Sequence, residues 1–382
     1  MNQELRELQR SAGATFASSA SGIEMPIFGN DAAALRAARE GVAICDRSHW
    51  GRIQVAGADR IRFLHNQTTN DFQKLKPQQS CETVFITSTA RTIDLATAYI
   101  AEDATILLVS PNRREKIMAW LDRYIFPADK VYIEDITDST GCFSAIGPGS
   151  TALLEQLGVS LDWESPAPPE NVLPENVLPE NSSPENSSPE NKPGRHQIVE
   201  LNGIPVRIAT GSGLAAVGYT FIFAIENAAA LWQTLTNAGA VCLGEDCWEQ
   251  LRIQQGRPAP DLELTEDYNP LEAGLWQTIS FEKGCYIGQE TIARLNTYKG
   301  VKQQLWGLRL SAPSEPGTTV TAEEEKVGTL TSYVETSEGF FGLAYIRTKA
   351  GGAGLKVRVG NVDGVAIDLP FLSRGYLQDQ EV

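Results

Sequence analysis

The pattern of hydrophobic and polar positions predicts alternating helices and strands over the first 165 residues. Some segments repeat apolar residues at helical spacing, and others show the alternation or short apolar run of a strand. Asp31 and Gly41 bracket one helix with an N-terminal cap and a C-terminal stop. The predicted helices are 1–16 (amphipathic), 32–40, 59–66 and 112–124; the predicted strands are 51–57, 83–88, 92–103, 105–110, 131–137 and 142–147.

The same kind of pattern resumes after residue 194. Asn202-Gly203 separates two strand-like runs, so the sequence predicts a hairpin over 197–210. A strand at 218–225 and helices at 228–240 and 247–258 follow, and the helices stop at glycine or proline.

Residues 166–194 interrupt this pattern with a Pro-Glu-Asn unit that recurs every five residues. Proline blocks helices and sheet ladders, and the glutamates repel one another. The sequence therefore predicts a disordered, extended spacer. Because similar elements lie on both sides, the insert interrupts one α+β unit rather than separating two unrelated domains.

From residue 303 the pattern changes to short strands between turns that contain glycine or proline, which is typical of a small antiparallel β-barrel or sandwich. The predicted strands are 305–311, 326–335, 340–346, 355–360 and 365–371. We therefore expect an α+β protein in four parts. They are a first α+β region (1–165), the insert (166–194), a second α+β region (195–302) and a β-barrel (303–382).

Composition narrows the choice of partners. Hydrophobic residues make up 42% and charged residues 21% of the chain, as in ordinary globular proteins. The formal net charge is -16 and no basic block occurs, which argues against nucleic acid and anionic membrane surfaces as partners. No apolar run suits a signal peptide or a membrane span, so a cytoplasmic location is predicted.

The six cysteines are scattered and form no C-x-x-C pair. A disulfide framework is therefore not expected, nor is a self-contained zinc or iron–sulfur site. With only three histidines in the chain, no metal site is predicted. The cysteines are Cys45, Cys81, Cys142, Cys242, Cys247 and Cys285.

The richest segment for chemistry is 283–290, which reads Lys-Gly-Cys-Tyr-Ile-Gly-Gln-Glu. Glycines on both sides of Cys285 predict a tight loop, and Lys283 is near enough in sequence to stabilise a thiolate. A helix predicted directly after the loop adds backbone N–H groups that favour an anion. From these features alone, a reactive cysteine and a buried cysteine in a glycine-rich turn remain equally open.

As a block, these eight residues resemble the signature of the YgfZ-type proteins, folate-binding relatives of the glycine-cleavage T-protein that are implicated in assembling or repairing iron–sulfur clusters. Asp46-Arg47-Ser48-His49 resembles the D-x-S-H segment of this superfamily, and 57–71 resembles its next element. Residues 92–94 resemble the stretch that places a carboxylate near folate in the T-protein, and 251–253 its L-R-hydrophobic element. The resemblance covers nearly the whole chain except the insert.

The resemblance implies an aminomethyltransferase-like folate-binding fold, in which two mixed α/β subdomains surround a central cavity and a small antiparallel β-barrel follows. It implies tetrahydrofolate, or a folate derivative, as cofactor. It also implies Cys285 as the functional thiol, with Lys283 beside it. The implied folate-binding residues are Asp94, Arg252, Gln254, Tyr286, Gln289 and Glu290.

One position departs from the T-protein. Gln254 stands where the T-protein has the glutamate that recognises the pterin. An amide can still form hydrogen bonds with a pterin edge, but it carries no charge. This departure counts against aminomethyl transfer. Tyr99 and Trp276 are further aromatic candidates for pterin contact, although core packing is the favoured role for either one.

Three functions follow from the resemblance, and whether the chain is an enzyme stays open. In the first, the chain is an iron–sulfur maturation factor whose Cys285 is a transient ligand or redox group. Client proteins or assembly factors would complete the coordination, because clusters need several thiolates. In the second, the chain is a folate-dependent aminomethyl or one-carbon transferase that does not need Cys285. In the third, it is a non-catalytic folate-dependent regulator that uses the insert to contact partners.

Overall fold

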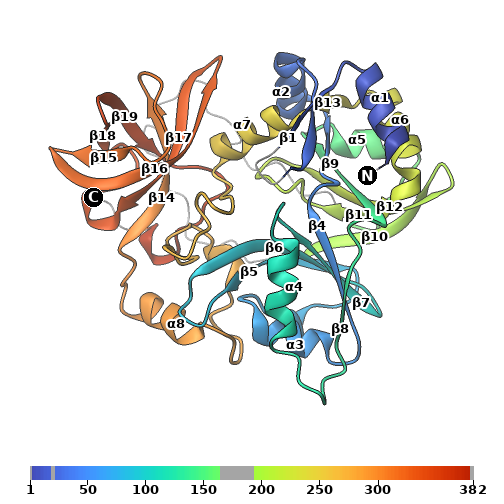
Figure 1. The fold of residues 1–382 in the computed structure, drawn as a ribbon, viewed down its shortest axis with the longest axis horizontal. Helices are drawn as coiled ribbons and strands as arrows, with labels where there is room; N and C mark the ends of the chain where they lie inside the picture. Colours follow the sequence, from blue (N-terminus) through green and yellow to red (C-terminus); the bar gives the residue numbers. More distant parts are fainter. Residues whose placement is uncertain (1, 19–21, 164–192, 379–382) are drawn as a thin grey trace.

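The computed structural model describes residues 2–18, 22–163 and 193–378. Figure 1 shows three lobes: a β-barrel on the left, an upper α/β lobe that contains α2 and α6, and a lower α/β lobe that contains α3 and α4. The predicted spacer lies outside the described residues, apart from Pro193 and Gly194 at its end.

Both α/β lobes are built on one sheet with the strand order β13-β3-β9-β12-β11-β10-β5-β6-β7-β4-β8. Only β13 and β3 pair in parallel. The strands are β3 (Ala43–Asp46), β4 (Gly51–Ala56), β5 (Gln79–Ile86), β6 (Thr92–Ile100), β7 (Ala104–Val109), β8 (Tyr132–Asp135), β9 (Thr140–Ile146), β10 (Gly194–Leu201), β11 (Ile204–Thr210), β12 (Gly218–Ala224) and β13 (Val241–Leu243). A separate two-stranded sheet contains β1 (Thr15–Ser18) and β2 (Glu24–Ile27).

The two halves of the large sheet meet at a short ladder between β10 and β5, where Gly194 pairs with Ser80 and Arg195 with Gln79. Strands on the β13 side of this joint come from both the first and the second α+β region. The two regions therefore share one sheet, as expected for a unit that an insert interrupts.

Helices cover the sheet and bury three apolar cores. One core lies under α1, α5 and α6 and includes Phe143, Phe221 and Trp232. A second lies under α3 and α4 and includes Phe85 and Leu121. A third lies under α2 and α7. The helices are α1 (Gln3–Ser11), α2 (Asp31–Glu40), α3 (Arg60–Gln67), α4 (Arg114–Asp122), α5 (Ser150–Gln156), α6 (Ala228–Asn237), α7 (Glu245–Gln255) and α8 (Gln289–Thr297), with short 3-10 turns at 72–74, 225–227, 276–278, 348–350 and 375–377.

The hairpin turn follows directly from its two residues. Leu201 pairs with Ile204, so Asn202 and Gly203 form a two-residue turn. Both have positive φ, 52° and 79°, as a type I′ turn requires. Asparagine and glycine are the residues that adopt this backbone most easily, which is why this turn could be predicted.

The C-terminal strands form a closed barrel in the order β14-β17-β16-β15-β18-β19. Its interior is filled by aliphatic side chains such as Leu308, Leu330 and Ile346, all fully buried. The strands are β14 (Gln303–Leu310), β15 (Thr319–Ala322), β16 (Glu325–Thr336), β17 (Gly339–Arg347), β18 (Lys356–Val359) and β19 (Val362–Ile367). The predicted α+β fold with a C-terminal antiparallel barrel is therefore confirmed.

The elements missing from the sequence prediction are short. They are β1, β2, β3, β13, β15 and α5, of which α5 is the longest with seven residues. In such short segments too few apolar residues recur for the two-residue period of a strand to be distinguished from the 3.6-residue period of a helix. The predicted helix at 247–258 begins slightly earlier, at Glu245, because Glu245 and Asp246 occupy its first turn.

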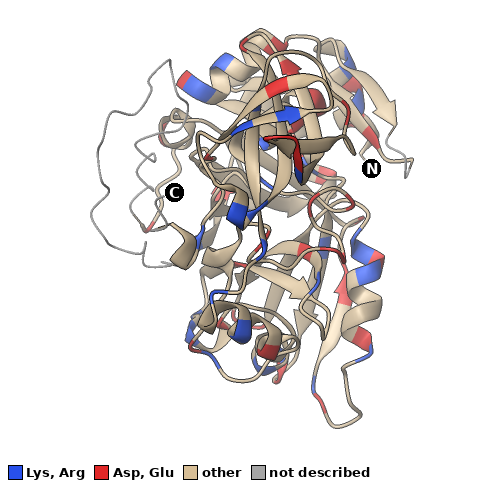
Figure 2. Ribbon diagram, turned by 90° about the vertical axis from the view of Figure 1, so that its left-hand side faces the viewer, with Lys and Arg blue, Asp and Glu red and all other residues tan. Residues whose placement is uncertain are grey.

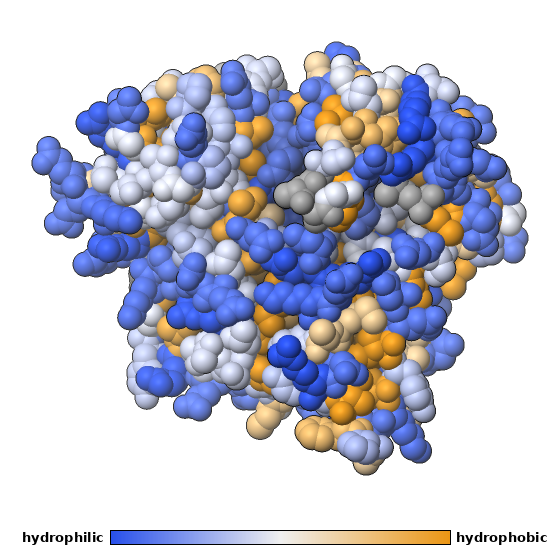
Figure 3. Space-filling model, in the orientation of Figure 1, coloured by the Kyte–Doolittle hydropathy of each residue, from blue (hydrophilic) through white to orange (hydrophobic). Residues whose placement is uncertain are grey.

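Charge is distributed evenly over the described surface. Lys and Arg alternate with Asp and Glu over the lobes (Figure 2), and the face seen in Figure 3 is mainly hydrophilic with small apolar patches. None of the described helices is both long and apolar enough to span a bilayer.

Candidate functional site

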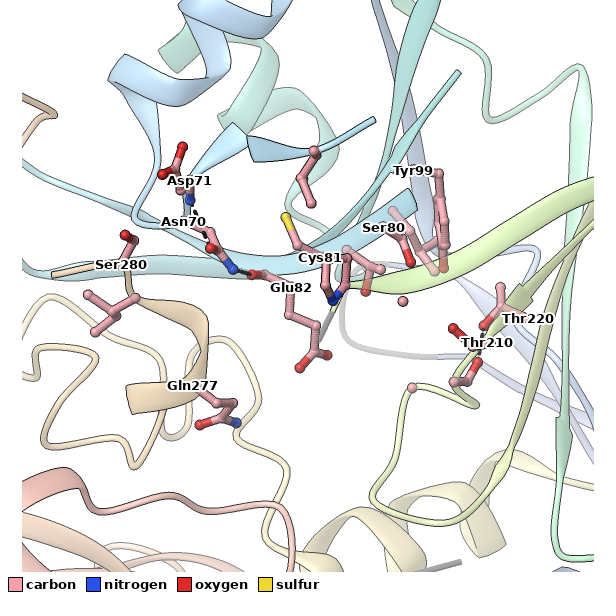
Figure 4. Close-up of a pocket in the computed structure, with 18 of the residues that line it drawn as sticks. Asn70, Asp71, Ser80, Cys81, Glu82, Tyr99, Thr210, Thr220, Gln277 and Ser280 are labelled. Carbon is pink, nitrogen blue, oxygen red and sulfur yellow. Dashed lines mark hydrogen bonds between the residues drawn. The ribbon is translucent and has the colours of Figure 1, made fainter. Parts of the chain in front are cut away.

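The main candidate site is a cavity of about 1060 Å³ between the two halves of the large sheet and the segment that leads to the barrel. Figure 4 shows side chains from β5, from the β11–β12 side and from the 277–280 segment around the same space. Its walls are Arg47, Asn70, Asp71, Lys74, Leu75, Ser80, Cys81, Glu82, Thr97, Tyr99, Leu108, Pro193, Gly194, Thr210, Gly211, Gly213, Leu214, Thr220, Gln277, Ile279, Ser280, Phe281, Glu282 and Phe371.

Strand alternation explains how β6 contributes to this cavity. Thr97 and Tyr99 are two residues apart, so both side chains lie on the cavity face. Tyr99 is almost completely buried, and burial raises the pKa of its hydroxyl group. Its ring meets His196 edge to face with 5.7 Å between the centroids. This wall therefore offers an aromatic surface with neutral hydrogen-bonding groups.

A carboxylate lies on the neighbouring strand β5, where Glu82 pairs with Thr97 of β6. The Glu82 side chain lines the cavity, and its Oε1 atom is 3.2 Å from Nη1 of Arg257. Arg257 itself is buried against Trp50 and Phe371, with 5.5 and 5.2 Å from its guanidinium carbon to the ring centroids. A partly exposed, paired carboxylate of this kind can accept hydrogen bonds from the N–H groups of a ligand.

Lys283, the first residue of the eight-residue motif, is directed into the end of α3. Its ammonium group donates to the backbone carbonyls of His65, Thr68 and Asn70 at 2.5 to 2.8 Å. These carbonyls follow the last helical hydrogen bonds and would otherwise lack donors. Burial lowers the pKa of Lys283 to about 7. The three donors of the ammonium group thus fasten the motif to the large sheet.

The rest of the motif follows the cavity wall formed by Phe281 and Glu282, and Tyr286 within it is buried. Cys285 is exposed, whereas the other five cysteines are buried or partly buried. The Tyr286 N–H donates to Oε1 of Gln289 at 3.1 Å, which closes the loop in front of α8. Tyr286, Gln289 and Glu290 line a separate shallow surface pocket and not the main cavity.

Asp94 is fully buried on β6. Its Oδ2 atom accepts the Ser110 N–H at 2.9 Å, and its Oδ1 atom has no hydrogen-bond partner in the described chain. Burial raises the pKa of this carboxyl group to about 6. Alternation places Asp94 on the face of β6 opposite Thr97 and Tyr99, outside the cavity lining. Its predicted role in folate binding therefore rests on the resemblance.

Arg252 and Gln254 are also outside the cavity lining. The Arg252 guanidinium pairs with Glu249 and, at 3.0 Å, with the completely buried Glu263, and it also donates to Ser332 of the barrel. This network joins α7 to β16. Gln254 is mostly buried and accepts a long 3.4 Å hydrogen bond from Gln250. The folate-binding roles of both residues remain predictions.

Of the residues that line the cavity, the sequence singled out Tyr99, as an aromatic candidate for pterin contact. Arg47 occurred only as the x of the D-x-S-H segment, and nothing in the sequence marked Glu82. The signal of Glu82 and Thr97 was weak, because both stand in strands that carry other polar residues, such as Ser80 and Asp94. No group of three or more His, Cys, Asp or Glu side chains suited to a metal ion occurs among the described residues.

Comparison with known proteins defines the class. Residues 5–169 match the model of the GCVT N-terminal domain. The structure superposes on glycine cleavage system aminomethyltransferase T from Bartonella henselae with a TM-score of 0.78 and 20% identity, covering 97% of this chain and 98% of that one. The fold is therefore that of the aminomethyltransferases of the glycine cleavage system.

The sequence relatives make the assignment specific. A chloroplastic protein of Arabidopsis thaliana, a transferase by name, is 45% identical over 91% of this chain and 75% of its own length. An aminomethyltransferase of Halalkalibacterium halodurans is 25% identical over 89% of both chains. The chain belongs to the GcvT-like aminomethyltransferase family.

Proposed function

We propose that this protein is a tetrahydrofolate-binding accessory protein of iron–sulfur cluster assembly or repair, with Cys285 as its functional thiol. The observation that carries the proposal is the exposure of Cys285 within the Lys-Gly-Cys-Tyr-Ile-Gly-Gln-Glu motif. An exposed thiol in a loop fastened by a buried lysine can meet a partner protein without unfolding. The other five thiols are buried or partly buried and are less accessible to a partner.

The cavity supports folate as the bound cofactor. Its volume of about 1060 Å³ is of the size used for drug-sized ligands, which are typically held in about 300 to 1,000 Å³. Its walls combine the aromatic ring of Tyr99, the carboxylate of Glu82 and the guanidinium of Arg47. These groups suit a flat heterocycle with N–H donors and an acidic tail. A bound tetrahydrofolate would supply a one-carbon carrier, and the chain's own residues would bind and orient it.

A second candidate is a folate-dependent one-carbon transferase. Relatives named aminomethyltransferases match nearly the full length of this chain, and the Arabidopsis relative is also a transferase by name. The neutral Gln254 in place of a pterin-recognising glutamate weighs against this candidate. The regulator hypothesis depends on residues 166–194, nearly all of which lie outside the described chain.

We also propose that the protein works in a reducing compartment, because its described cysteines are free thiols. This compartment is the cytoplasm or, by analogy with the chloroplastic relative, a plastid.

The experiment is complementation of cells that lack this protein, with the activity of an iron–sulfur enzyme as the readout. The variants are Cys285→Ala and, as a matched control, Cys247→Ala, which removes a buried thiol. The proposal predicts that wild type and Cys247→Ala restore activity and that Cys285→Ala does not, at equal protein levels. Equal rescue by all three would remove Cys285 from the mechanism and favour the transferase. No rescue by wild type would end the iron–sulfur assignment.

A further inference from the structure

Arg47 occupies an unusual position at the deep side of the cavity. It follows β3 directly, its side chain lines the cavity, and the residue is only 1% exposed. The guanidinium contacts two indole rings that stand at 80° to each other, with its central carbon 3.7 Å from the Trp50 centroid and 4.5 Å from the Trp248 centroid. Contact with two aromatic rings holds a guanidinium in place and leaves its N–H groups available for hydrogen bonds.

The hydrogen bonds of this guanidinium are incomplete. Nη1 donates to the Ser144 hydroxyl and to the Ser212 carbonyl, both at 3.0 Å. Nε is buried and has no acceptor in the described chain. No carboxylate of the described residues lies within 4 Å of the Arg47 side chain. A buried N–H donor without an acceptor is costly, so the unpaired Nε indicates a missing acceptor.

Other buried arginines of the same molecule show what a structural role looks like. In Arg52, Nε and both Nη atoms donate, to backbone carbonyls and to the Thr140 hydroxyl. In Arg252, the same three nitrogens are occupied and two carboxylates balance the charge. Arg47 is equally buried, but its Nε lacks the acceptor that both of these arginines have. Packing alone therefore does not explain it.

The surroundings of Arg47 increase the local positive charge. Arg257 is in contact with the same Trp50 ring and uses Glu82 as its own partner. This end of the cavity therefore holds two guanidinium groups and one paired carboxylate. Gly213 approaches so closely that a Cβ atom there would lie 2.3 Å from Nη1, which allows the loop to wall off the guanidinium from one side. The remaining open side is the cavity.

We propose that Arg47 is the anchor for an oxyanion of the ligand that fills this cavity. If the proposed function holds, on which this assignment of the ligand rests, the oxyanion is a carboxylate of the folate tail. A phosphate group has the same chemistry and is the alternative source.

The test compares two ligands and two variants by calorimetry. The ligands are 5-formyltetrahydrofolate, which carries carboxylates, and 6-methyltetrahydropterin, which has none. The variants are Arg47→Met and, as a control with the same change of charge at an exposed position on α4 outside the cavity lining, Lys116→Met. Loss of a charge-assisted hydrogen bond predicts that Arg47→Met weakens 5-formyltetrahydrofolate about tenfold to a hundredfold. Binding of the pterin should change less than about twofold, and Lys116→Met should change the binding of both ligands little.

The outcomes separate this proposal from the proposed function. If 5-formyltetrahydrofolate binds wild type and Arg47→Met equally well, the anchor is refuted and folate binding stands. If Arg47→Met weakens both ligands equally, the residue is structural and the anchor is again refuted. If wild type binds inorganic phosphate but no folate, and Arg47→Met no longer binds phosphate, the anion site stands and the folate assignment fails. Should Arg47→Met not fold, competition between phosphate and 5-formyltetrahydrofolate on wild type decides, and no competition refutes the anchor.

Discussion

Asp94 gives the sharpest stability prediction, because its carboxyl group is fully buried and one of its oxygens has no partner in the described chain. Burial raises its folded-state pKa from 3.8 to about 6, so the folded protein holds this proton at a higher pH than the unfolded chain does. Stability is therefore lost as the pH rises through the window between these two values. At pH 7.5 the buried charge costs about 3 kcal/mol, at 1.36 kcal/mol per pKa unit.

The substitution Asp94→Asn removes this charge and keeps an oxygen that can accept the Ser110 N–H. The new amide group has a fixed cost that does not depend on pH. The stability of the variant relative to wild type should therefore rise by about 2 kcal/mol between about pH 4.5 and about pH 7.5. Urea unfolding of wild type and variant at both pH values measures this change in relative stability. The pH-independent cost of the amide group is the same at both pH values and therefore cancels. A difference that does not change with pH would show that Asp94 ionises normally, and the reasoning from burial would be wrong.

Three further predictions concern the motif and the hairpin. Lys283→Met should destabilise the fold by about 2 to 4 kcal/mol, because three carbonyls lose their common donor; thermal unfolding measures this, and an unchanged melting temperature would contradict the anchoring role. The Cys285 thiol should react with a thiol reagent at least about tenfold faster than the other cysteines, and Cys285→Ser should remove this fast phase. Gly203→Ala should cost about 1 kcal/mol from backbone strain alone, because φ is 79° and nothing lies within 4 Å of the added methyl group.

A structural feature could be predicted from the sequence when its signal lies in a few neighbouring residues, and could not when it depends on contacts between distant segments. The turn at Asn202-Gly203 and the helix end before Gly256 depend on backbone preferences of one or two residues, so both were predicted correctly. The closed barrel was expected from strands separated by short turns. Strand pairing was beyond reach, because the joint between β5 and β10 connects residues separated by more than a hundred positions.

The candidate site was harder to predict for the same reason. The exposure of Cys285 was inferred from resemblance, and its loop was expected from flanking glycines. The partners of Lys283 could not be predicted, since its contacts with the end of α3 depend on how two distant segments pack. Arg47 and Glu82 meet at the cavity only because the two halves of the sheet are joined edge to edge, and no local pattern encodes this.

The order of strands in the large sheet has a consequence for the integrity of the chain. β13, β12, β11 and β10 follow the insert in sequence, yet they pair with β3, β9 and β5, which precede it. The pieces on either side of residues 166–192 are thus interleaved by backbone hydrogen bonds. A protease that cut within the repeat should leave a two-chain molecule that stays together and keeps its cavity. The same topology makes this position a natural place to divide the protein into two fragments that reassemble when produced together.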